Sequence, residues 1–260
     1  MKLATYVVPG DSAVRAGEVR GGRVHAFVEG TIVDRLRSGD LAPASGPEHA
    51  LSEVELQAPV PRPRAIFGIG LNYAAHAKEQ GKAPPERPIV FMKLPSSAAA
   101  PNAPVRCPPV VRRLDYEGEL GVVMGAGGRV AGYCVADDVS ARDLQKLEPQ
   151  WTRAKGADGF CPFGPWVTTA DEVPDPEDLR LRTWVNGELR QDSRTNDMVF
   201  GVAELVAFIA ETCTLEPGDL ILTGTPSGVG MALDPPRFLA SGDRVRIEIE
   251  ALGAIEHPIA

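Results

Sequence analysis

Glycine and proline interrupt this chain throughout its length. The sequence holds 27 glycines and 24 prolines among 260 residues, whereas an average protein contains about 12% of these two residues together. Both residues favour turns and weaken the interiors of helices and strands, so the chain is expected to form many short elements. The two residues follow no repeat, which excludes a collagen-like rod, and the composition excludes a disordered tail or a coiled coil.

The composition is typical of a folded protein in water. Hydrophobic residues make up 43% and charged residues 24% of the chain, near the average for globular domains. The formal net charge is −8 and no run of Lys or Arg occurs, so nucleic acid is not an expected partner. The N-terminus lacks the apolar core of a signal peptide, and no stretch approaches the roughly 18 apolar residues of a spanning helix. We therefore expect a cytoplasmic, soluble protein with no membrane partner.

The cysteines are too dispersed for a disulfide framework or a zinc site. They form no CxxC pair, and no histidine lies at zinc-finger spacing from them. We expect all four to be reduced and mostly buried, as small apolar residues: Cys107, Cys134, Cys161 and Cys213.

A segment rich in proline, alanine and serine divides the chain into two parts. Residues 1–60 contain two β-rich runs, at 1–8 and 23–36, and are predicted to form a small N-terminal β-domain. A linker is predicted within 41–64, because prolines restrict both themselves and the residues before them. Residues 61–260 are then the second domain.

Strand patterns outnumber helical patterns in the second part. The hairpin signal is the clearest, because Asn186-Gly187 is typical of a type I′ turn between strands. Strands are expected at 65–72, 89–94, 114–124, 129–140, 179–185, 188–191, 220–230 and 243–251, and helices at 74–82, 141–151 and 202–213. The predicted fold class is therefore mainly β with a few helices (α+β).

Two glutamates on one strand are candidate metal ligands. Glu117 and Glu119 lie at i and i+2 in an apolar strand, so their side chains project from the same face. A second strand, joined to the first by a glycine turn, ends in Asp137-Asp138 and would bring one of these two carboxylates beside the glutamates. Three carboxylates without His or Cys suit a hard ion such as Mg²⁺, Mn²⁺ or Ca²⁺. The alternative is an exposed strand whose glutamates face water.

Two further groups could take part in catalysis. His76 and Glu79 lie at i and i+3 of a predicted helix, where a carboxylate can orient an imidazole as a general base. Lys155, between aromatic and glycine-rich segments, could face a developing anion. The alternatives are a solvated surface pair for the first and a surface lysine for the second.

Two glycine-rich loops do not match known cofactor-binding patterns. The loop at 223–230 lacks the GK[ST] ending of a phosphate-binding loop. The loop at 125–132 lacks the helix and acidic residue of a dinucleotide fingerprint. We therefore exclude nucleotide binding at both.

The order of these motifs resembles that of the fumarylacetoacetate hydrolase family over roughly residues 60–260. The resemblance rests on GLNYAAHAKE, FMKLPSS, LDYEGELGVV, DDVSARDLQ, AKGADGFCPFGPW, VNGELRQ and LILTGTPSGVG. It implies mixed, mainly antiparallel sheets rolled into a barrel-like sandwich, a homodimer, and a small N-terminal β-domain of the kind found in many bacterial members.

The resemblance also implies roles for individual residues. Those matching the family's Mg²⁺ or Mn²⁺ ligands are Glu117, Glu119 and Asp138; those matching its catalytic residues are His76, Glu79 and Lys155; and those matching its substrate-binding residues are Arg142, Gln145 and Thr225. Residues that read the distal end of the substrate are expected in the lid segment 80–88.

The implied activity is divalent-metal-dependent chemistry on a 2-oxo acid or 1,3-dicarbonyl through an enolate. We expect hydrolysis of a C–C bond in an acylpyruvate or fumarylpyruvate-type substrate of aromatic catabolism. The alternatives are an isomerase or decarboxylase acting on 2-hydroxyhepta-2,4-diene-1,7-dioate (5-carboxymethyl-2-hydroxymuconate), an oxaloacetate decarboxylase or tautomerase, and a catalytically silent binding protein. One family core serves many reactions, because kinship of fold does not fix chemistry.

Overall fold

Most strands of the protein join one large sheet. The computed structural model describes residues 1–260, and the strands of this sheet are β1 (Lys2–Val7), β2 (Arg15–Arg20), β3 (Arg23–Ala26), β4 (Glu48–Ala50), β5 (Glu55–Gln57), β6 (Ile66–Gly70), β7 (Ile89–Lys93), β8 (Ala98–Ala99), β10 (Gly118–Met124), β11 (Val130–Asp137), β13 (Cys161–Thr169) and β16 (Leu220–Leu222). Their order is β4-β3-β2-β1-β13-β11-β10-β16-β6-β7, with β5 beside β1 and β8 beside β13. The predicted mainly β fold class is confirmed.

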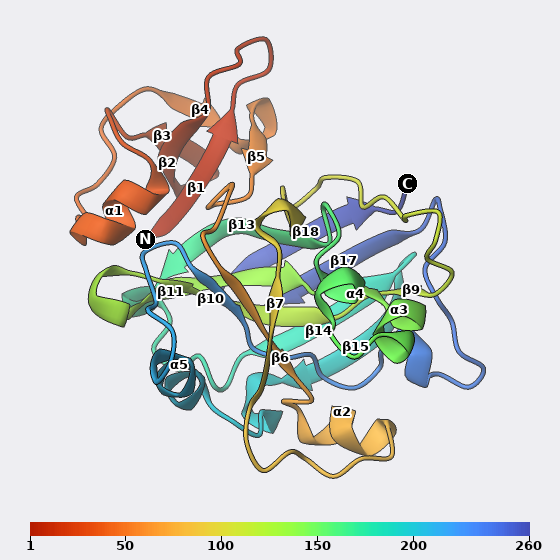
Figure 1. The fold of residues 1–260 in the computed structure, drawn as a ribbon. Coiled ribbons are helices and arrows are strands. Elements are labelled where there is room, and N and C mark those ends of the chain that lie inside the picture. The colour runs from red at the N-terminus through yellow and green to blue at the C-terminus, as the bar shows by residue number, and fades with distance from the viewer.

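Two smaller sheets and a few short helices complete the fold (Figure 1). The four-stranded sheet has the order β15 (Glu188–Arg194), β14 (Arg180–Val185), β17 (Arg244–Ile249), β18 (Gly253–Pro258), and the two-stranded sheet pairs β9 (Leu114–Asp115) with β12 (Ser140–Ala141). The α-helices are α1 (Ile32–Ser38), α2 (Ala74–Glu79), α3 (Arg142–Leu147), α4 (Thr152–Lys155) and α5 (Val202–Ala210). The 3₁₀ turns are η1 (Leu51–Glu53), η2 (Pro95–Ser97), η3 (Ala126–Gly128), η4 (Ala170–Glu172), η5 (Thr195–Asp197) and η6 (Gly230–Ala232). None of the helices is long and apolar enough to cross a membrane.

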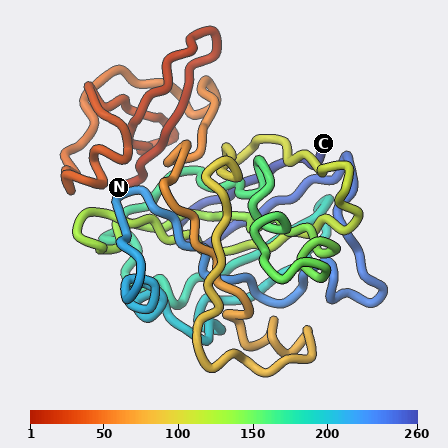
Figure 2. The backbone as a smooth tube through the Cα atoms, in the orientation of Figure 1, coloured from red at the N-terminus to blue at the C-terminus, as the bar shows by residue number.

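The N-terminal part differs from its prediction in two places. The predicted β run at 23–36 ends after β3, and α1 follows, because Thr31 and Asp34 form a capping box that starts a helix. The predicted linker contains β4 and β5, which pair with β3 and β1. Figure 1 shows these red and orange elements grouped beside the main body, and Figure 2 follows the chain from this group into it.

The helix predicted at 141–151 is two short helices, α3 and α4. Pro149 lies between them, and proline disfavours helical backbone at the residue before it; Glu148 there has ψ 140°. The predicted hairpin is confirmed, with both turn residues in the left-handed region (φ 52° at Asn186 and 79° at Gly187). The helix predicted from residue 202 is confirmed as α5.

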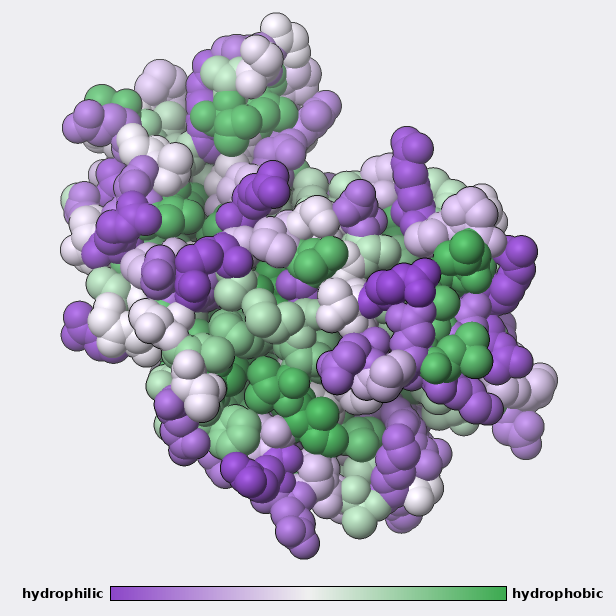
Figure 3. Space-filling view, in the orientation of Figure 1, coloured by the Kyte–Doolittle hydropathy of each residue, from purple (hydrophilic) through white to green (hydrophobic).

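Two apolar cores hold the sheets together. The larger packs one face of the large sheet, including Leu120 and Val135, against the four-stranded sheet, including Leu181 and Ile247. The second core lies on the other face and joins residues of the N-terminal part to residues of β11, β13 and β16. On the outside, β7 is an edge strand with exposed apolar side chains, and Figure 3 shows green surface over this part of the molecule.

Candidate active site and metal centre

Three buried carboxylates meet where β10 and β11 lie side by side. Antiparallel pairing places Glu119 opposite Ala136 and Gly118 opposite Asp137, so the residues that follow β11 lie beside those that precede β10. The structure brings Glu117, Glu119 and Asp138 together, with one ligand oxygen of each within 4.8 Å of the others. All three are buried, so the alternative of an exposed strand with its glutamates in water is wrong.

The tertiary structure separates the roles of Asp137 and Asp138. Asp137 accepts a hydrogen bond from the backbone N–H of Glu117 (2.9 Å) and contacts Nε2 of His257 (2.9 Å). Both of its carboxylate oxygens are therefore engaged by a backbone N–H and a histidine rather than by the side chains of the triad, and Asp137 fixes the backbone at Glu117. Asp138 is the residue whose side chain joins the two glutamates.

Three buried cations hold this carboxylate cluster. Nζ of Lys155 donates to Glu117 and to Asp138 (2.6 Å to the latter), and Lys93, fully buried on β7, donates to the other oxygen of Asp138 (2.6 Å). Arg142 forms ion pairs with Glu117 (2.6 Å) and Asp115 (2.9 Å). The alternative of a surface position for Lys155 is wrong, because its side chain is 2% exposed.

The pKa values of the two glutamates move in opposite directions. Burial raises the pKa of Glu117, but the charges of Arg142 and Lys155 outweigh burial and hold it well below its usual range. Burial, together with the negative charges of Asp138 and Glu117, raises the pKa of Glu119 well above its usual range. Glu119 receives a hydrogen bond only from the backbone N–H of Gly224 (2.7 Å).

This arrangement fits a divalent cation. The four buried carboxylates, those of the triad and Asp115, face three buried cations, which leaves one negative charge without compensation. Unpaired buried charge is costly. Glu119 is the carboxylate that has no cationic partner, so it carries the uncompensated charge. The donor set consists of carboxylate oxygens alone, which suits Mg²⁺, Mn²⁺ or Ca²⁺ better than softer metals.

The histidine and glutamate of α2 form a hydrogen-bonded pair at the edge of the same cavity. Nδ1 of His76 lies 2.6 Å from Glu79, whose second oxygen accepts from the backbone N–H of Gly228 (2.8 Å). The side-chain amide of Gln80 donates to Nε2 of His76 (2.8 Å). The solvated surface pair is therefore wrong: the His76 side chain is buried, and both ring nitrogens are held in place.

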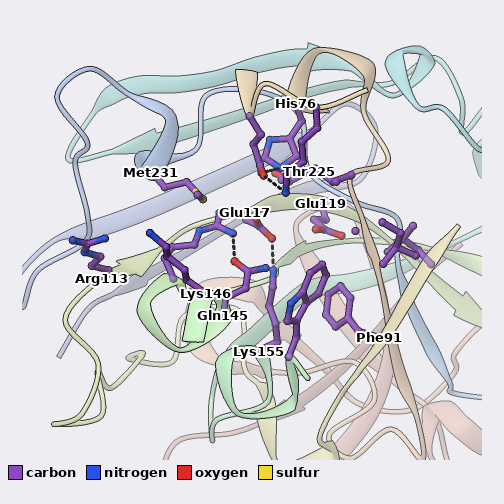
Figure 4. A pocket seen from close by; sticks show the side chains of 18 of the residues that line it. His76, Phe91, Arg113, Glu117, Glu119, Gln145, Lys146, Lys155, Thr225 and Met231 are labelled. Carbon is purple, nitrogen blue, oxygen red and sulfur yellow. Dashed lines mark hydrogen bonds and ion pairs between the residues drawn. The ribbon is translucent and has the colours of Figure 1, made fainter. Parts of the chain in front are cut away.

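A cavity of about 640 Å³ connects the two groups (Figure 4). Arg142 and Gln145 line it and are joined by a hydrogen bond of 3.0 Å. Thr225 also lines it, but its hydroxyl donates to the backbone of Gly118 (3.0 Å) and accepts from Gln191 (2.8 Å). Thr225 therefore fastens the loop after β16 to β10 in addition to facing the cavity.

Lys93 and Asp115 belong to the site but were not predicted from the sequence, and Gln80 was expected only as part of the lid segment 80–88. Lys93 is the last residue of an apolar strand. A lysine at the end of an apolar run is the sequence signal that could have indicated a buried, paired cation there. Asp115 lies two residues before Glu117 in the same alternation, and it holds both Arg142 and the backbone of Gly230 (2.8 Å). No local pattern indicated that Gln80 would contact His76.

Comparison with known proteins identifies the family. The sequence model described as "Fumarylacetoacetate (FAA) hydrolase C-terminal" matches residues 65–260. The chain belongs to the fumarylacetoacetate hydrolase family.

Relatives in this family carry names for different reactions. A mitochondrial oxaloacetate tautomerase of Xenopus laevis is 45% identical over 226 residues, covering 82% of this chain and 71% of that protein. The structure of a 2-hydroxyhepta-2,4-diene-1,7-dioate isomerase from Mycobacterium marinum is 36% identical with a TM-score of 0.83, covering 100% of this chain and 98% of that one. The structure of a fumarylacetoacetate hydrolase from Exiguobacterium antarcticum is 35% identical with a TM-score of 0.89, covering 100% and 99%. Family membership therefore fixes the fold and leaves the reaction to be argued from the site.

Proposed function

We propose that this protein is a divalent-metal-dependent enzyme that moves a proton between carbon and oxygen of a 2-oxo acid, as a keto–enol tautomerase or isomerase. The supporting observation is the His76–Glu79 pair, which supplies one oriented base at the cavity that also holds the carboxylate triad. The names of the tautomerase and isomerase relatives favour the same class of reaction.

The metal site of this proposal consists of Glu117, Glu119 and Asp138. A bound Mg²⁺ or Mn²⁺ supplies Lewis-acid polarisation of the 2-oxo group. Lys93 and Lys155 keep Asp138 ionised and oriented, and Glu119 holds the negative charge that the buried cations leave uncompensated.

His76 is the residue that transfers the proton. Its Nδ1–H is held by Glu79, so the lone pair on Nε2 is the basic site. Nε2 takes the proton from the carbon next to the 2-oxo group; the C–H electron pair forms the C=C bond, and the carbonyl electrons move to oxygen. Returning the same proton to that oxygen completes the tautomerisation with no net change in atoms. The amide of Gln80 must leave Nε2 before the substrate can reach it.

Lys155 and Arg142 stabilise the negative charge that develops on the substrate oxygen. Both are buried and fixed by ion pairs, so their positive charge faces the substrate oxygen and carboxylate without reorganisation. Trp151 and Phe91 pack edge to face at the cavity wall, with ring centroids 5.3 Å apart, and they exclude water from that side.

Replacement of His76 tests this proposal. We expect His76→Ala to slow oxaloacetate keto–enol conversion, followed by ultraviolet absorbance, by about 10²–10⁴-fold while metal binding is unchanged. His49→Ala, a histidine on β4 far from the cavity, is the matched control. Conversion by His76→Ala at the wild-type rate would contradict the assignment.

Hydrolysis of a C–C bond is the second candidate, and the size of the cavity favours it. About 640 Å³ exceeds the room that a four-carbon acid fills, leaving space for an acyl group and an attacking water that His76 would activate. A panel of acylpyruvates, fumarylpyruvate, oxaloacetate and dienedioates, followed by loss of ultraviolet absorbance, separates the candidates. Cleavage products from an acylpyruvate would favour the hydrolase, and enol–keto conversion without cleavage would favour the tautomerase.

A further inference from the structure

His257 is a fully buried polar residue outside the cavity. It lies on β18 two residues after Ile255, so both side chains project from the same face of the strand, which packs against β11 and β13 (Figure 1). Its one side-chain hydrogen bond joins Nε2 to Asp137 (2.9 Å), and Nδ1 has no partner in the protein. Because burial of a polar ring is costly, packing alone would be served better by an apolar side chain such as that of Ile255. The bond to Asp137 is therefore what sets His257 apart from the core around it.

Asp137 joins His257 to the backbone of Glu117. An ionised carboxylate can only accept hydrogen bonds, so Nε2–H of His257 donates to Oδ2, while the backbone N–H of Glu117 donates to Oδ1 (2.9 Å). With one donor on each oxygen, the carboxylate cannot rotate without losing a bond and leaving a buried acceptor unpaired. The imidazole therefore fixes the orientation in which Asp137 holds Glu117.

The backbone at Glu117 depends on side chains, because it lies in the short break between β9 and β10. Its N–H donates to no backbone carbonyl, and Asp137 is its acceptor. The next N–H, that of Gly118, donates to the side chain of Gln191 on β15 (3.0 Å). Both supports lead to the four-stranded sheet, through His257 on β18 and Gln191 on β15. That sheet therefore holds the backbone from which the Glu117 side chain enters the cavity.

Glu117 is the carboxylate on which the inner cations meet. Arg142 pairs with one of its oxygens and Lys155 with the other, and Figure 4 shows its side chain pointing toward Lys155. Mg²⁺ requires nearly ideal octahedral placement of its oxygen ligands. A small displacement of the Glu117 backbone would therefore weaken binding of a divalent cation at the triad.

We propose that His257 is a positioning residue of the metal centre: its hydrogen bond orients Asp137, and Asp137 holds Glu117 where its carboxylate can bind the cation. This inference rests on the metal site of the proposed function. Removing a group that orients metal ligands lowers metal affinity about 10- to 100-fold. His257 does not line the cavity, so its effect on the cation must pass through Asp137.

The test removes the donor of His257 and then restores one. His257→Phe keeps a planar ring without a donor, and His257→Asn ends one bond short of the position of Nε2. His257→Gln carries an amide N–H at about that position. Ile255→Ala is the matched control, because Ile255 is buried on the same face of β18 and has no polar side-chain atom. Calorimetry gives the Kd for Mn²⁺ of each protein, and the Tm in EDTA gives its loss of stability.

We expect His257→Phe and His257→Asn to weaken Mn²⁺ binding about 10- to 100-fold, and His257→Gln to recover most of the affinity. Ile255→Ala should lower the Tm, because it leaves a cavity in the core, and should keep the wild-type Kd. A wild-type Kd in the variants without a donor, or equal weakening in Ile255→Ala, would overturn the proposal. So would a His257→Gln protein that binds no better than His257→Asn.

Hydrogen exchange at the backbone N–H of Glu117 tests the same link in the metal-free protein. A buried, hydrogen-bonded N–H exchanges only when the structure around it opens. By NMR, we expect this N–H to be protected in wild type and His257→Gln, and to exchange faster in His257→Phe than in Ile255→Ala. Equal exchange at Glu117 in wild type and His257→Phe would overturn the positioning role.

The two measurements separate this inference from the proposed function. Absence of Mn²⁺ binding in wild type would contradict the metal site of the proposed function. Loss of Glu117 protection in His257→Phe would then still support the link through Asp137. Mn²⁺ binding that is equally tight in wild type and His257→Phe would leave the metal site standing and overturn the role of His257.

Discussion

Glu119 differs from the other two carboxylates of the triad in how its charge is balanced. Glu117 and Asp138 each receive cationic side chains, whereas Glu119 receives one backbone N–H. At the scale of single residues, the charge of this site is therefore arranged so that a divalent ion completes it.

Glu119→Gln is expected to remove metal binding and to stabilise the metal-free protein. A carboxyl whose pKa is raised on folding holds its proton more tightly in the folded state, so its ionisation costs stability as pH rises above its usual range. At neutral pH the variant in EDTA should therefore melt above metal-free wild type. Mn²⁺ at 100 times its Kd should raise the free energy of unfolding of wild type by about 2.7 kcal/mol. The same concentration of Mn²⁺ should not change the free energy of unfolding of the variant. An equal rise in Tm with Mn²⁺ in both proteins would contradict the site.

Lys93→Met tests the buried lysine that sequence reasoning missed. Removing one member of a buried ion pair costs about 3–5 kcal/mol, so the metal-free variant should lose that much free energy of unfolding in urea. Saturating Mg²⁺ should reduce the deficit, because it replaces a positive charge beside Asp138. Lys78→Met, an exposed lysine of α2, is the control. Equal losses in both variants would show that the Lys93 pair is dispensable.

At the scale of elements, the loop after β16 contacts three carboxylates of the site. Between β16 and the first residue of η6, the backbone N–H of Gly224 donates to Glu119, that of Gly228 to Glu79, and that of Gly230 to Asp115. The carbonyl of Gly228 also accepts from Tyr116 (2.8 Å). The backbone of one loop therefore positions Glu119, a candidate metal ligand, Glu79, which orients His76, and Asp115, which pairs with Arg142.

Gly228→Ala is expected to displace this loop. Gly228 has φ +103°, and an added Cβ would lie 2.0 Å from the carbonyl oxygen of Arg190, so the loop must move and Glu79 loses its backbone donor. We expect kcat to fall by about 10-fold or more, as for loss of an oriented general base. Gly159→Ala is the control, with φ +76° and no atom within 4 Å. Equal activity of the two variants would contradict the role of the loop.

At the scale of the whole molecule, the N-terminal part shares a core with the rest. Leu3 and Ile32 belong to the same apolar cluster as Phe163 and Val167, and β1 pairs with β13. The division at residue 60 stays a prediction, as does the homodimer implied by the resemblance, which the molar mass in solution would test.

Removal of residues 1–60 is expected to destabilise the remainder. Residues 61–260 alone would expose the apolar face of β13 and free the strand edge that β1 covers, and exposed edges promote aggregation. We expect one calorimetric unfolding transition for the full chain and a lower Tm or aggregation for the truncated chain. Supplying residues 1–60 as a separate peptide should restore part of the stability. A truncated chain that melts at the full-length Tm would show two independent domains.

Local patterns predicted the elements that depend on neighbouring residues. Strand alternation, the Asn186-Gly187 turn and the apolar stripe of α5 are short-range signals, and each is present in the structure. The spacing of Glu117 and Glu119 and of His76 and Glu79 also fixed which side chains share a face. Where a competing local signal was overlooked, as with the capping box of α1, the prediction was wrong.

Contacts between distant segments could not be predicted from those patterns. The choice of Asp138 over Asp137, the pairing of Lys93 with Asp138 and the contact of Gly228 with Glu79 join residues that only strand register and packing bring together. Local patterns were enough to predict the mainly β class, the short elements separated by glycine and proline, and the residue types of the site. Which carboxylates meet and which cations balance them depends on the packing of distant segments, because burial and long-range pairing set the cost of each charge.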